Sequence, residues 1–466
     1  MKLIKGIRNT LIVLIVCLTA YLIYEMYPAQ AQDLLAQLTS GRYGERTAVV
    51  ETEKEIAEES LRTDLPETTY GKQEGSLPAF YDCRVTGKAP VIKSQGTLGT
   101  CWAVAASSAL ESVLLPKESV VFSADHISTQ NSYSNNQEEG GACLISTAYL
   151  AAWQGPVTEE QDPYGDSISA EGLSAVRHVQ EIQMVTDRDF GAIKRLIYDY
   201  GAVQCSVYMD MGGDRRTSPY YDPVSASYYY DGSAQINHDV LIIGWDDTYP
   251  AENFTHLPDR DGAFICQNSW GESFGENGIF YVSYEDSWIG SNCAAYTKIE
   301  PADNYDHIYQ SDLCGWVGQM GYGEETCWFA NVYQAESDQI LRAVGFYATG
   351  RDTEYEICVV PDYQNTFSLV LYEKVQTGKF KNTGYYTAEL KKSFDISAGQ
   401  KFAVLVKIRT PGSKYPVAME YRADASTEQV ILDDGEGYVS ADGYRWIRME
   451  EEYDGNICLK AYTDEK

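Results

Sequence analysis

A single cysteine, Cys101, stands where a glycine-containing segment meets a run of small residues. Residues 101–116 read CWAVAASSALESVLLP, and their small side chains and closing proline predict a buried helix that begins at Cys101. Thr100 directly precedes this helix, in the position of a capping residue. Backbone N–H groups and the dipole at a helix N-terminus favour a thiolate over a thiol. The chemistry predicted here is nucleophilic attack by sulfur.

A sulfur nucleophile needs a proton carrier, and His238 is the candidate among the five histidines of the chain. It lies near the start of INHDVLIIGWDD, a run that predicts a strand and so holds the imidazole at the rim of a rigid sheet. Residues 262–267 predict another strand, and Asn268 follows them. The amide of Asn268 can accept the second imidazole proton, and Trp270 can cover that hydrogen bond from water. An asparagine that merely occupies a turn is the alternative.

These motifs, in the order Cys, His, Asn, resemble those of the papain-like cysteine peptidases. The matching residues are Gln95-Gly96, Gly99-Thr100-Cys101-Trp102, Asn237-His238 and Asn268-Ser269-Trp270-Gly271. The resemblance covers about Leu77 to Glu300 and implies a two-lobed α+β fold with a helical lobe and a β-barrel-like lobe. Asn268 comes later than the family spacing, and the polar stretch DDTYPAENFTHLPDRDG accounts for the delay as an inserted loop.

The resemblance also implies a role for each catalytic candidate. Cys101 would attack the peptide carbonyl, and His238 would form the imidazolium partner and later donate a proton to the leaving amine. Asn268 would orient His238. The Gln95 side chain and the backbone N–H of Cys101 would form the oxyanion hole.

Substrate-binding residues follow from a weaker part of the same resemblance. Gly140 and Gly141 correspond to a glycine pair that borders the cleft, although a plain turn explains the pair nearly as well. Trp270 is the third substrate-binding candidate. Leu98 occupies the position where the family often has a disulfide-bonded cysteine, so that covalent link is expected to be absent. No helical pro-domain signature precedes the cysteine motif.

Composition limits the classes of partner and cofactor. The chain has 466 residues, which suggests two domains and a tail, and a formal net charge of -32 from 36 Lys+Arg and 68 Asp+Glu. Such a polyanion repels phosphate backbones, so no nucleic-acid partner is expected. Its eleven cysteines are scattered, without a CxxC pair or an adjacent histidine cluster. We therefore predict no metal site and no cofactor.

The N-terminus predicts export of the rest of the chain. Residues 1–27 place three basic side chains before an apolar run at 11–23, which favours a cytoplasmic N-terminus and an external body. An uncleaved signal anchor would give a single-pass protein of the cell membrane. Cleavage after the Ala-Gln-Ala at 29–31 would instead give a secreted protein. Residues 28–76 are acidic and predict a linker or stalk, with a short inhibitory pro-segment as the alternative.

The last third of the chain has a different pattern. Residues 303–466 contain about eight short alternating segments, which predict a β-sandwich next to a peptidase domain at 77–302. This part resembles the lectin-like β-domain that follows papain-like domains in some microbial surface proteins. Trp316 or Tyr322 could stack on sugars, although we favour core packing for both. We expect the sandwich to fold separately, with modest contacts to its neighbour.

The sequence thus predicts an extracytoplasmic cysteine endopeptidase whose partners are a peptide or protein substrate, the membrane through its N-terminal segment, and a cell-wall or glycan ligand of the C-terminal domain. Two alternatives stay open. One is a surface adhesion protein with an inactive papain-like domain. The other is thiol-dependent acyl transfer or peptidoglycan amide cleavage, because nucleophile and acyl acceptor use the same machinery.

Overall fold

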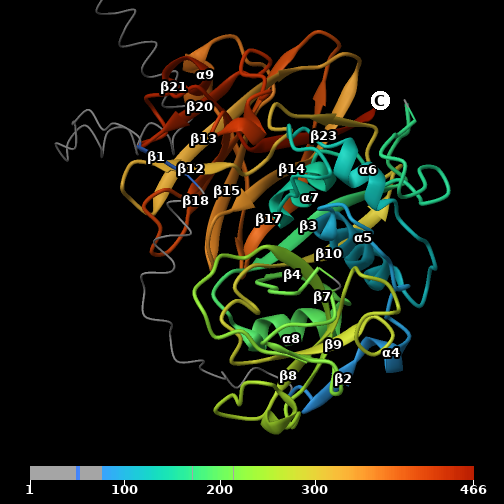
Figure 1. Ribbon diagram of the computed structural model, residues 1–466. Coiled ribbons are helices and arrows are strands. Elements are labelled where there is room, and N and C mark those ends of the chain that lie inside the picture. The colour runs from blue at the N-terminus through green and yellow to red at the C-terminus, as the bar shows by residue number, and fades with distance from the viewer. Residues whose placement is uncertain (1–48, 53–75, 171, 214) are drawn as a thin grey trace, which may run out of the picture.

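The computed structural model describes residues 49–52, 76–170, 172–213 and 215–466 (Figure 1). We call residues 77–302 the N-terminal unit and residues 303–466 the C-terminal unit. The helices of the described part are short, apart from one of 14 residues. They are α4 (Cys83–Thr86), α5 (Cys101–Leu114), α6 (Ala124–Thr129), α7 (Cys143–Ala151), α8 (Phe190–Asp199) and α9 (Met449–Glu452), with 3-10 turns η1 (Ala251–Asn253), η2 (Thr366–Val370) and η3 (Ala425–Thr427).

Helix α5 confirms the predicted helix that begins at Cys101. Twelve of its 14 residues are buried, and its small side chains let it lie against α6, α7 and three strands of the main sheet at once. It ends before Pro116, which cannot donate a helical hydrogen bond. The prediction that Thr100 caps the helix is only partly confirmed, because its side chain makes no capping hydrogen bond. Thr100 occupies the N-cap position, but its hydroxyl shares a hydrogen bond with the hydroxyl of Tyr164 (2.5 Å).

One long mixed sheet forms the backbone of the N-terminal unit. Its strand order is β11-β23-β14-β17-β3-β10-β4-β7-β8-β9-β6-β5, with β2 beside β7. The strands from the N-terminal unit are β2 (Phe80–Asp82), β3 (Arg177–Val185), β4 (Val203–Val207), β5 (Tyr221–Asp222), β6 (Ser227–Tyr228), β7 (His238–Asp246), β8 (Ala263–Gln267), β9 (Ile279–Ser283) and β10 (Cys293–Pro301). β7 and β8 confirm the two predicted strands and pair antiparallel. The inserted loop lies between them and contains η1.

The C-terminal unit is almost entirely β-structure, as predicted. Its strands are β11 (His307–Tyr309), β12 (Gly318–Gly321), β13 (Thr326–Gln334), β14 (Gln339–Ala348), β15 (Thr353–Val360), β16 (Glu373–Phe380), β17 (Thr383–Ile396), β18 (Lys401–Arg409), β19 (Val417–Tyr421), β20 (Gly437–Ser440), β21 (Ile447–Arg448), β22 (Gly455–Ile457) and β23 (Leu459–Glu465). A six-stranded sheet, β16-β15-β18-β13-β20-β21, shares one apolar core with β14, β17 and β23. That core makes the unit a sandwich.

The prediction of only modest contacts between the two units is wrong. Strand β17 of the C-terminal unit pairs directly with β3 of the N-terminal unit, with Tyr385 opposite Ile182, so one sheet runs through both units (Figure 1). Tyr347 and Tyr385 are buried in the same apolar core as the residues of α5 and β7. The hydroxyl of Tyr133 donates to the carbonyl of Cys314 across the boundary (2.7 Å). The two units therefore share backbone pairing and part of one apolar core.

Aromatic and cysteine side chains of the C-terminal unit serve packing. Trp316 and Tyr322 are partly buried against the two main cores, which agrees with the structural role we favoured for them. The ten cysteines in the described ranges are all free thiols and all buried. Within the described residues, no disulfide therefore lies near Leu98, the position at which the resemblance would place a disulfide-bonded cysteine.

The predicted signal anchor at residues 1–27 lies outside the described residues. Across the residues that the structure does describe, no helix is both long enough and apolar enough to cross a membrane. Of the predicted linker, only strand β1 (Val49–Thr52) and residue 76 are described. β1 pairs antiparallel with β12 at the edge of a four-stranded sheet, β1-β12-β19-β22, in the C-terminal unit.

Candidate active site

His238 and Asn268 form the best-defined contact of the candidate site. His238 is the first residue of β7, and Asn268 follows the last residue of the neighbouring strand β8. His238 Nε2 lies 2.8 Å from Asn268 Oδ1. The same oxygen accepts the backbone N–H of Ser269 (2.8 Å), which fixes the orientation of the amide. Nε2 of the imidazole must therefore carry its proton, and Nδ1 is left free to accept one.

Trp270 covers this hydrogen bond and links it to Gln95. The indole lies 4.7 Å from the His238 ring, centroid to centroid, and meets Phe274 edge-on at 4.8 Å. Its Nε1–H donates to Gln95 Oε1 (3.1 Å), which also accepts the hydroxyl of Ser269 (2.5 Å). With its oxygen held twice, Gln95 presents its NH₂ group to the loop before α5. One of those protons binds the carbonyl of Leu98 (2.7 Å).

Cys101 lies at the N-terminus of α5, against β7. The backbone N–H groups of Asp239, Trp102 and Cys101 each lower the pKa of the Cys101 thiol, so all three lie near the sulfur. Asp239 directly follows His238, so the thiol lies beside the residue adjacent to the imidazole. Cys101 is 9% exposed and counts among the buried residues. Packing between α5 and β7 thus brings together residues that are far apart in the sequence.

Burial has a larger effect on the pKa of Cys101 than the backbone N–H groups at the helix N-terminus, and it also shifts the pKa of His238. Burial first, and then the charge of Asp239, raise the pKa of Cys101 to about 12, against the three backbone N–H groups that lower it. Burial lowers the pKa of His238 to about 4, the bond to Asn268 acts in the opposite direction, and the charge of Arg215 lowers it further. A thiol and a neutral imidazole are therefore the favoured forms at neutral pH. The backbone N–H groups at the start of α5 favour the thiolate, as predicted for a helix N-terminus, and burial acts against them.

The glycine pair lies against the approach to the cysteine. A Cβ on Gly141 would lie 2.5 Å from the indole of Trp102, and a Cβ on Gly99 would lie 2.9 Å from the backbone of Gly140. Gly140 also has φ +86, in the left-handed region that favours glycine. The loop is held by the Gly99 N–H, which donates to the carbonyl of Gln137 (2.7 Å). The pair is therefore required for close packing beside Cys101.

Two residues of the site were missed by the sequence reasoning. Asp239 is buried, accepts Gln204 Nε2 (2.6 Å), and has its pKa raised by burial. The sequence does show a carboxylate at this position, directly before the apolar run VLIIGW. Arg215 lies with its guanidinium carbon 5.0 Å from the centroid of the Trp270 ring. No sequence motif marks it, because a long loop brings it to Trp270.

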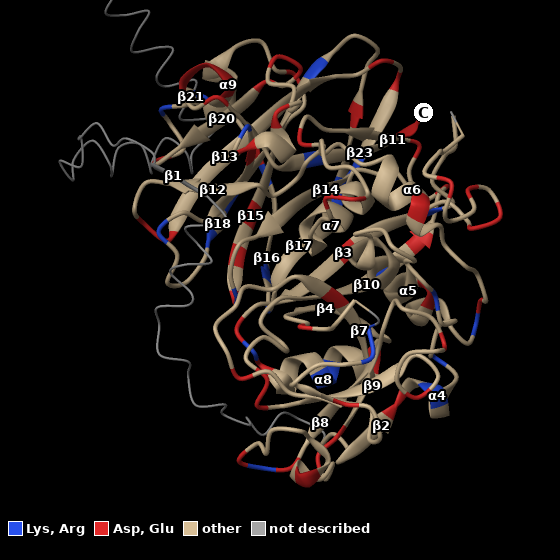
Figure 2. Cartoon of the chain, viewed as in Figure 1, with Lys and Arg blue, Asp and Glu red and all other residues tan. Residues whose placement is uncertain are grey.

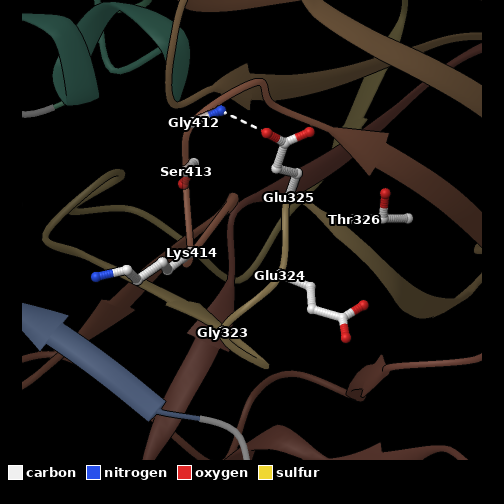
Figure 3. A pocket seen from close by; sticks show the side chains of 7 residues that line it. All are labelled: Gly323, Glu324, Glu325, Thr326, Gly412, Ser413 and Lys414. Atoms are coloured by element: carbon white, nitrogen blue, oxygen red, sulfur yellow. Dashed lines mark hydrogen bonds between the residues drawn. The ribbon is translucent and has the colours of Figure 1, made fainter.

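A second concave feature lies in the C-terminal unit. An open pocket of about 500 Å³ is formed where the turns after β12 and β18 meet (Figure 3). The Glu325 carboxylate accepts the backbone N–H of Gly412 there (2.9 Å). The lining residues are Gly323, Glu324, Glu325, Thr326, Gly412, Ser413 and Lys414. The lining has no aromatic ring on which a sugar could stack.

Comparison with known proteins agrees with this geometry. Residues 77–299 match the family described as "Papain family cysteine protease", and residues 308–463 match the "Lectin like domain" family. The viral cathepsin of Heliothis zea nuclear polyhedrosis virus is 30% identical over 220 residues, 46% of this chain and 54% of the relative. Cathepsin K of Mus musculus is 25% identical over 216 residues, 44% of this chain and 59% of the relative. The chain thus spans little more than half the length of these relatives.

A solved structure extends the likeness to both units. The crystal structure of the cysteine protease and lectin-like domains of Cwp84, a surface layer associated protein of Clostridium difficile, superimposes with a TM-score of 0.75. It is 20% identical and covers 91% of this chain and 100% of its own. At this identity the match shows a shared fold. Residues 77–299 are thus similar to the papain family of cysteine proteases, and residues 308–463 are similar to the lectin-like domain family.

Proposed function

We propose that this protein is an extracytoplasmic cysteine endopeptidase that acts through Cys101, His238 and Asn268. The observation that carries the proposal is the bond of His238 to an asparagine whose amide orientation is fixed by a second hydrogen bond. That arrangement leaves imidazole Nδ1 as a base beside a cysteine at a helix N-terminus. It is the arrangement a thiol needs to become a nucleophile.

The reaction follows from these positions. Nδ1 of His238 takes the proton of Cys101 as the sulfur forms a bond to the peptide carbonyl carbon. The developing oxyanion is stabilised by the backbone N–H of Cys101 and the second NH₂ proton of Gln95, and losing one such donor typically costs on the order of 10²–10³ in rate. His238 then gives its proton to the leaving nitrogen as the C–N bond breaks. Water, deprotonated by the same imidazole, hydrolyses the thioester and restores the thiol.

Substrate binding and location complete the proposal. Gly140, Gly141 and Trp270 border the cleft and contact the peptide substrate. The N-terminal segment at residues 1–27 tethers the enzyme to the cell membrane as a single span, or directs its secretion if it is cleaved. The lectin-like domain holds the enzyme at a cell-wall or glycan surface. Cwp84 is a surface layer associated protein, and this supports the proposed placement outside the cytoplasm.

Covalent labelling tests the proposal. An epoxide or fluoromethyl-ketone peptide probe should modify the protein once, at Cys101, and the same preparation should hydrolyse an internally quenched peptide. Cys101→Ala should lose both activities, whereas Cys83→Ala, which removes another buried thiol, should keep them. Absence of labelling and hydrolysis would indicate an inactive adhesion protein. Transfer of the acyl group to an added amine, without hydrolysis, would indicate an acyltransferase.

A further inference from the structure

The loop between β4 and β5 reaches the candidate cleft and is held there by specific contacts. Asn237, which directly precedes His238, accepts the N–H of Met209 (2.8 Å) and donates to the carbonyl of Met209 (3.2 Å). Further along, the N–H of Gly212 donates to the carbonyl of Thr217 (2.8 Å), and the N–H of Arg215 donates to the carbonyl of Gly212 (2.7 Å). These bonds fix the loop relative to the imidazole, so the position of Arg215 is set by the fold.

Arg215 extends over Trp270, which itself covers His238. The guanidinium carbon is 5.0 Å from the indole centroid, and the indole is 4.7 Å from the imidazole. A guanidinium that stacks on a ring keeps its N–H donors in its own plane, directed outward from the ring. The half-buried position of Arg215 keeps these donors within reach of a bound molecule. The charge of Arg215 also lowers the pKa of His238, which agrees with their proximity.

Within the described residues, the charge of Arg215 differs from that of other arginines in having no carboxylate partner. Arg84 pairs with Asp82 (2.7 Å), and Arg351 pairs with Asp189 (2.8 Å). Among the described residues, no carboxylate forms an ion pair with Arg215, and its side chain contacts the face of Trp270. Acidic residues are spread over both units (Figure 2), and the chain contains 68 Asp and Glu residues against 36 Lys and Arg residues. The guanidinium of Arg215 is therefore available to pair with a carboxylate of a bound substrate.

The chemistry of the proposed reaction places Arg215 near the part of the substrate that follows the scissile bond, which we call the leaving segment. His238 must donate its proton to the leaving nitrogen, so the leaving segment of the substrate begins beside the imidazole. Trp270 lies over that imidazole and Arg215 lies over Trp270. The side chains that Arg215 can meet therefore belong to the leaving segment, while Gly140 and Gly141 lie near the approach to Cys101 instead.

We propose that Arg215, held over Trp270, recognises a carboxylate on the leaving segment of the substrate. This inference rests on the proposed peptidase function and adds a substrate class to it. The carboxylate can come from an acidic side chain just after the scissile bond or from the C-terminus of a short leaving segment. Both present the same charge and the same planar pair of acceptors to a guanidinium.

The test compares matched peptides with the full-length protein. Starting from a peptide that the enzyme cleaves, the residue after the scissile bond is set to Glu, Gln or Lys, and kcat/KM is measured for each. A second pair of peptides ends two residues after the scissile bond, and its members differ only in having a free C-terminal carboxylate or a C-terminal amide. We expect about a tenfold preference for the carboxylate member of at least one pair, weakened by salt. Which pair shows it identifies the source of the carboxylate.

Variants separate this role from a structural one. Arg215→Gln should abolish the ratio of kcat/KM between the carboxylate and neutral members of the pair, whereas Arg215→Lys should retain part of that ratio. Arg195→Gln, which removes the same charge from an arginine paired with Asp199 on α8, should leave the preference intact. Equal rates for both members of each pair, or a preference that survives Arg215→Gln, would overturn the inference while the peptidase function stands. Failure to cleave any peptide would overturn both.

Discussion

Replacing Asn268 by alanine tests the geometry on which the mechanism depends. Asn268 Oδ1 accepts the Nε2–H of His238 at 2.8 Å, in a site where both residues are buried. A hydrogen bond to a charged group contributes about 1.5–3 kcal/mol and one between neutral groups about 0.5–1.5 kcal/mol. The imidazolium formed during reaction therefore loses about 1–1.5 kcal/mol more than the resting imidazole does. This corresponds to about a 5- to 15-fold fall in kcat/KM, before any loss from a rotated ring.

Asn268→Ala should also move the acid limb of the pH profile in a defined direction, to lower pH. The bond to Asn268 raises the pKa of His238, so Asn268→Ala should lower it, by about 1 unit for the energy above. In the resting pair of thiol and imidazole, activity is lost on acidification when His238 becomes protonated and can no longer accept a proton. The acid limb of kcat/KM, expected near the His238 pKa of about 4, should therefore move to lower pH. The assay is peptide hydrolysis from pH 3 to 10, with the melting temperature as a check on folding.

Asn268→Asp is the matched control, because it keeps an acceptor oxygen and adds a negative charge. It should raise the pKa of His238 and move the acid limb to higher pH, opposite to the alanine variant. A displaced basic limb with an unchanged acid limb would mean that the free enzyme holds a thiolate and an imidazolium. Unchanged kcat/KM in Asn268→Ala would refute the view that Asn268 orients and stabilises the imidazole.

The remaining predictions concern the nucleophile, its buried neighbour and the unit boundary. Cys101→Ala should lower kcat/KM by at least about 10³-fold with the melting temperature unchanged, and residual cleavage above that level would point to another nucleophile. Asp239→Asn should lower the pKa of Cys101 from about 12, since the charge of Asp239 raises it, and alkylation of the thiol by iodoacetamide should begin about 1–2 pH units lower. A chain ending at Glu300 should unfold at a lower temperature and lose activity on a short peptide, because it exposes β3 and the core beneath Tyr385; full activity would mean that the shared sheet is dispensable.

The sequence determined those parts of the site that depend on local pattern. The small residues after Cys101 permit only a closely packed helix, and the proline at 116 ends it. The apolar run at His238 and the strand before Asn268 place both side chains at ends of neighbouring strands, where they meet. The last third of the chain also follows from local pattern. Its segments alternate apolar and polar residues, and because successive side chains of a strand point to opposite faces, each segment buries one face, as in a β-sandwich.

Tertiary structure decided everything that depends on distant neighbours. Burial raises the pKa of Cys101 and lowers the pKa of His238, and the degree of burial is a property of the packed core. The pairing of β17 with β3 joins the two units, because a strand pattern does not specify which edge it will meet. Arg215 reaches Trp270 at the end of a loop whose path is fixed by bonds to Asn237 and within the loop itself. Such contacts arise only when the chain has folded, since no periodicity along the sequence encodes them.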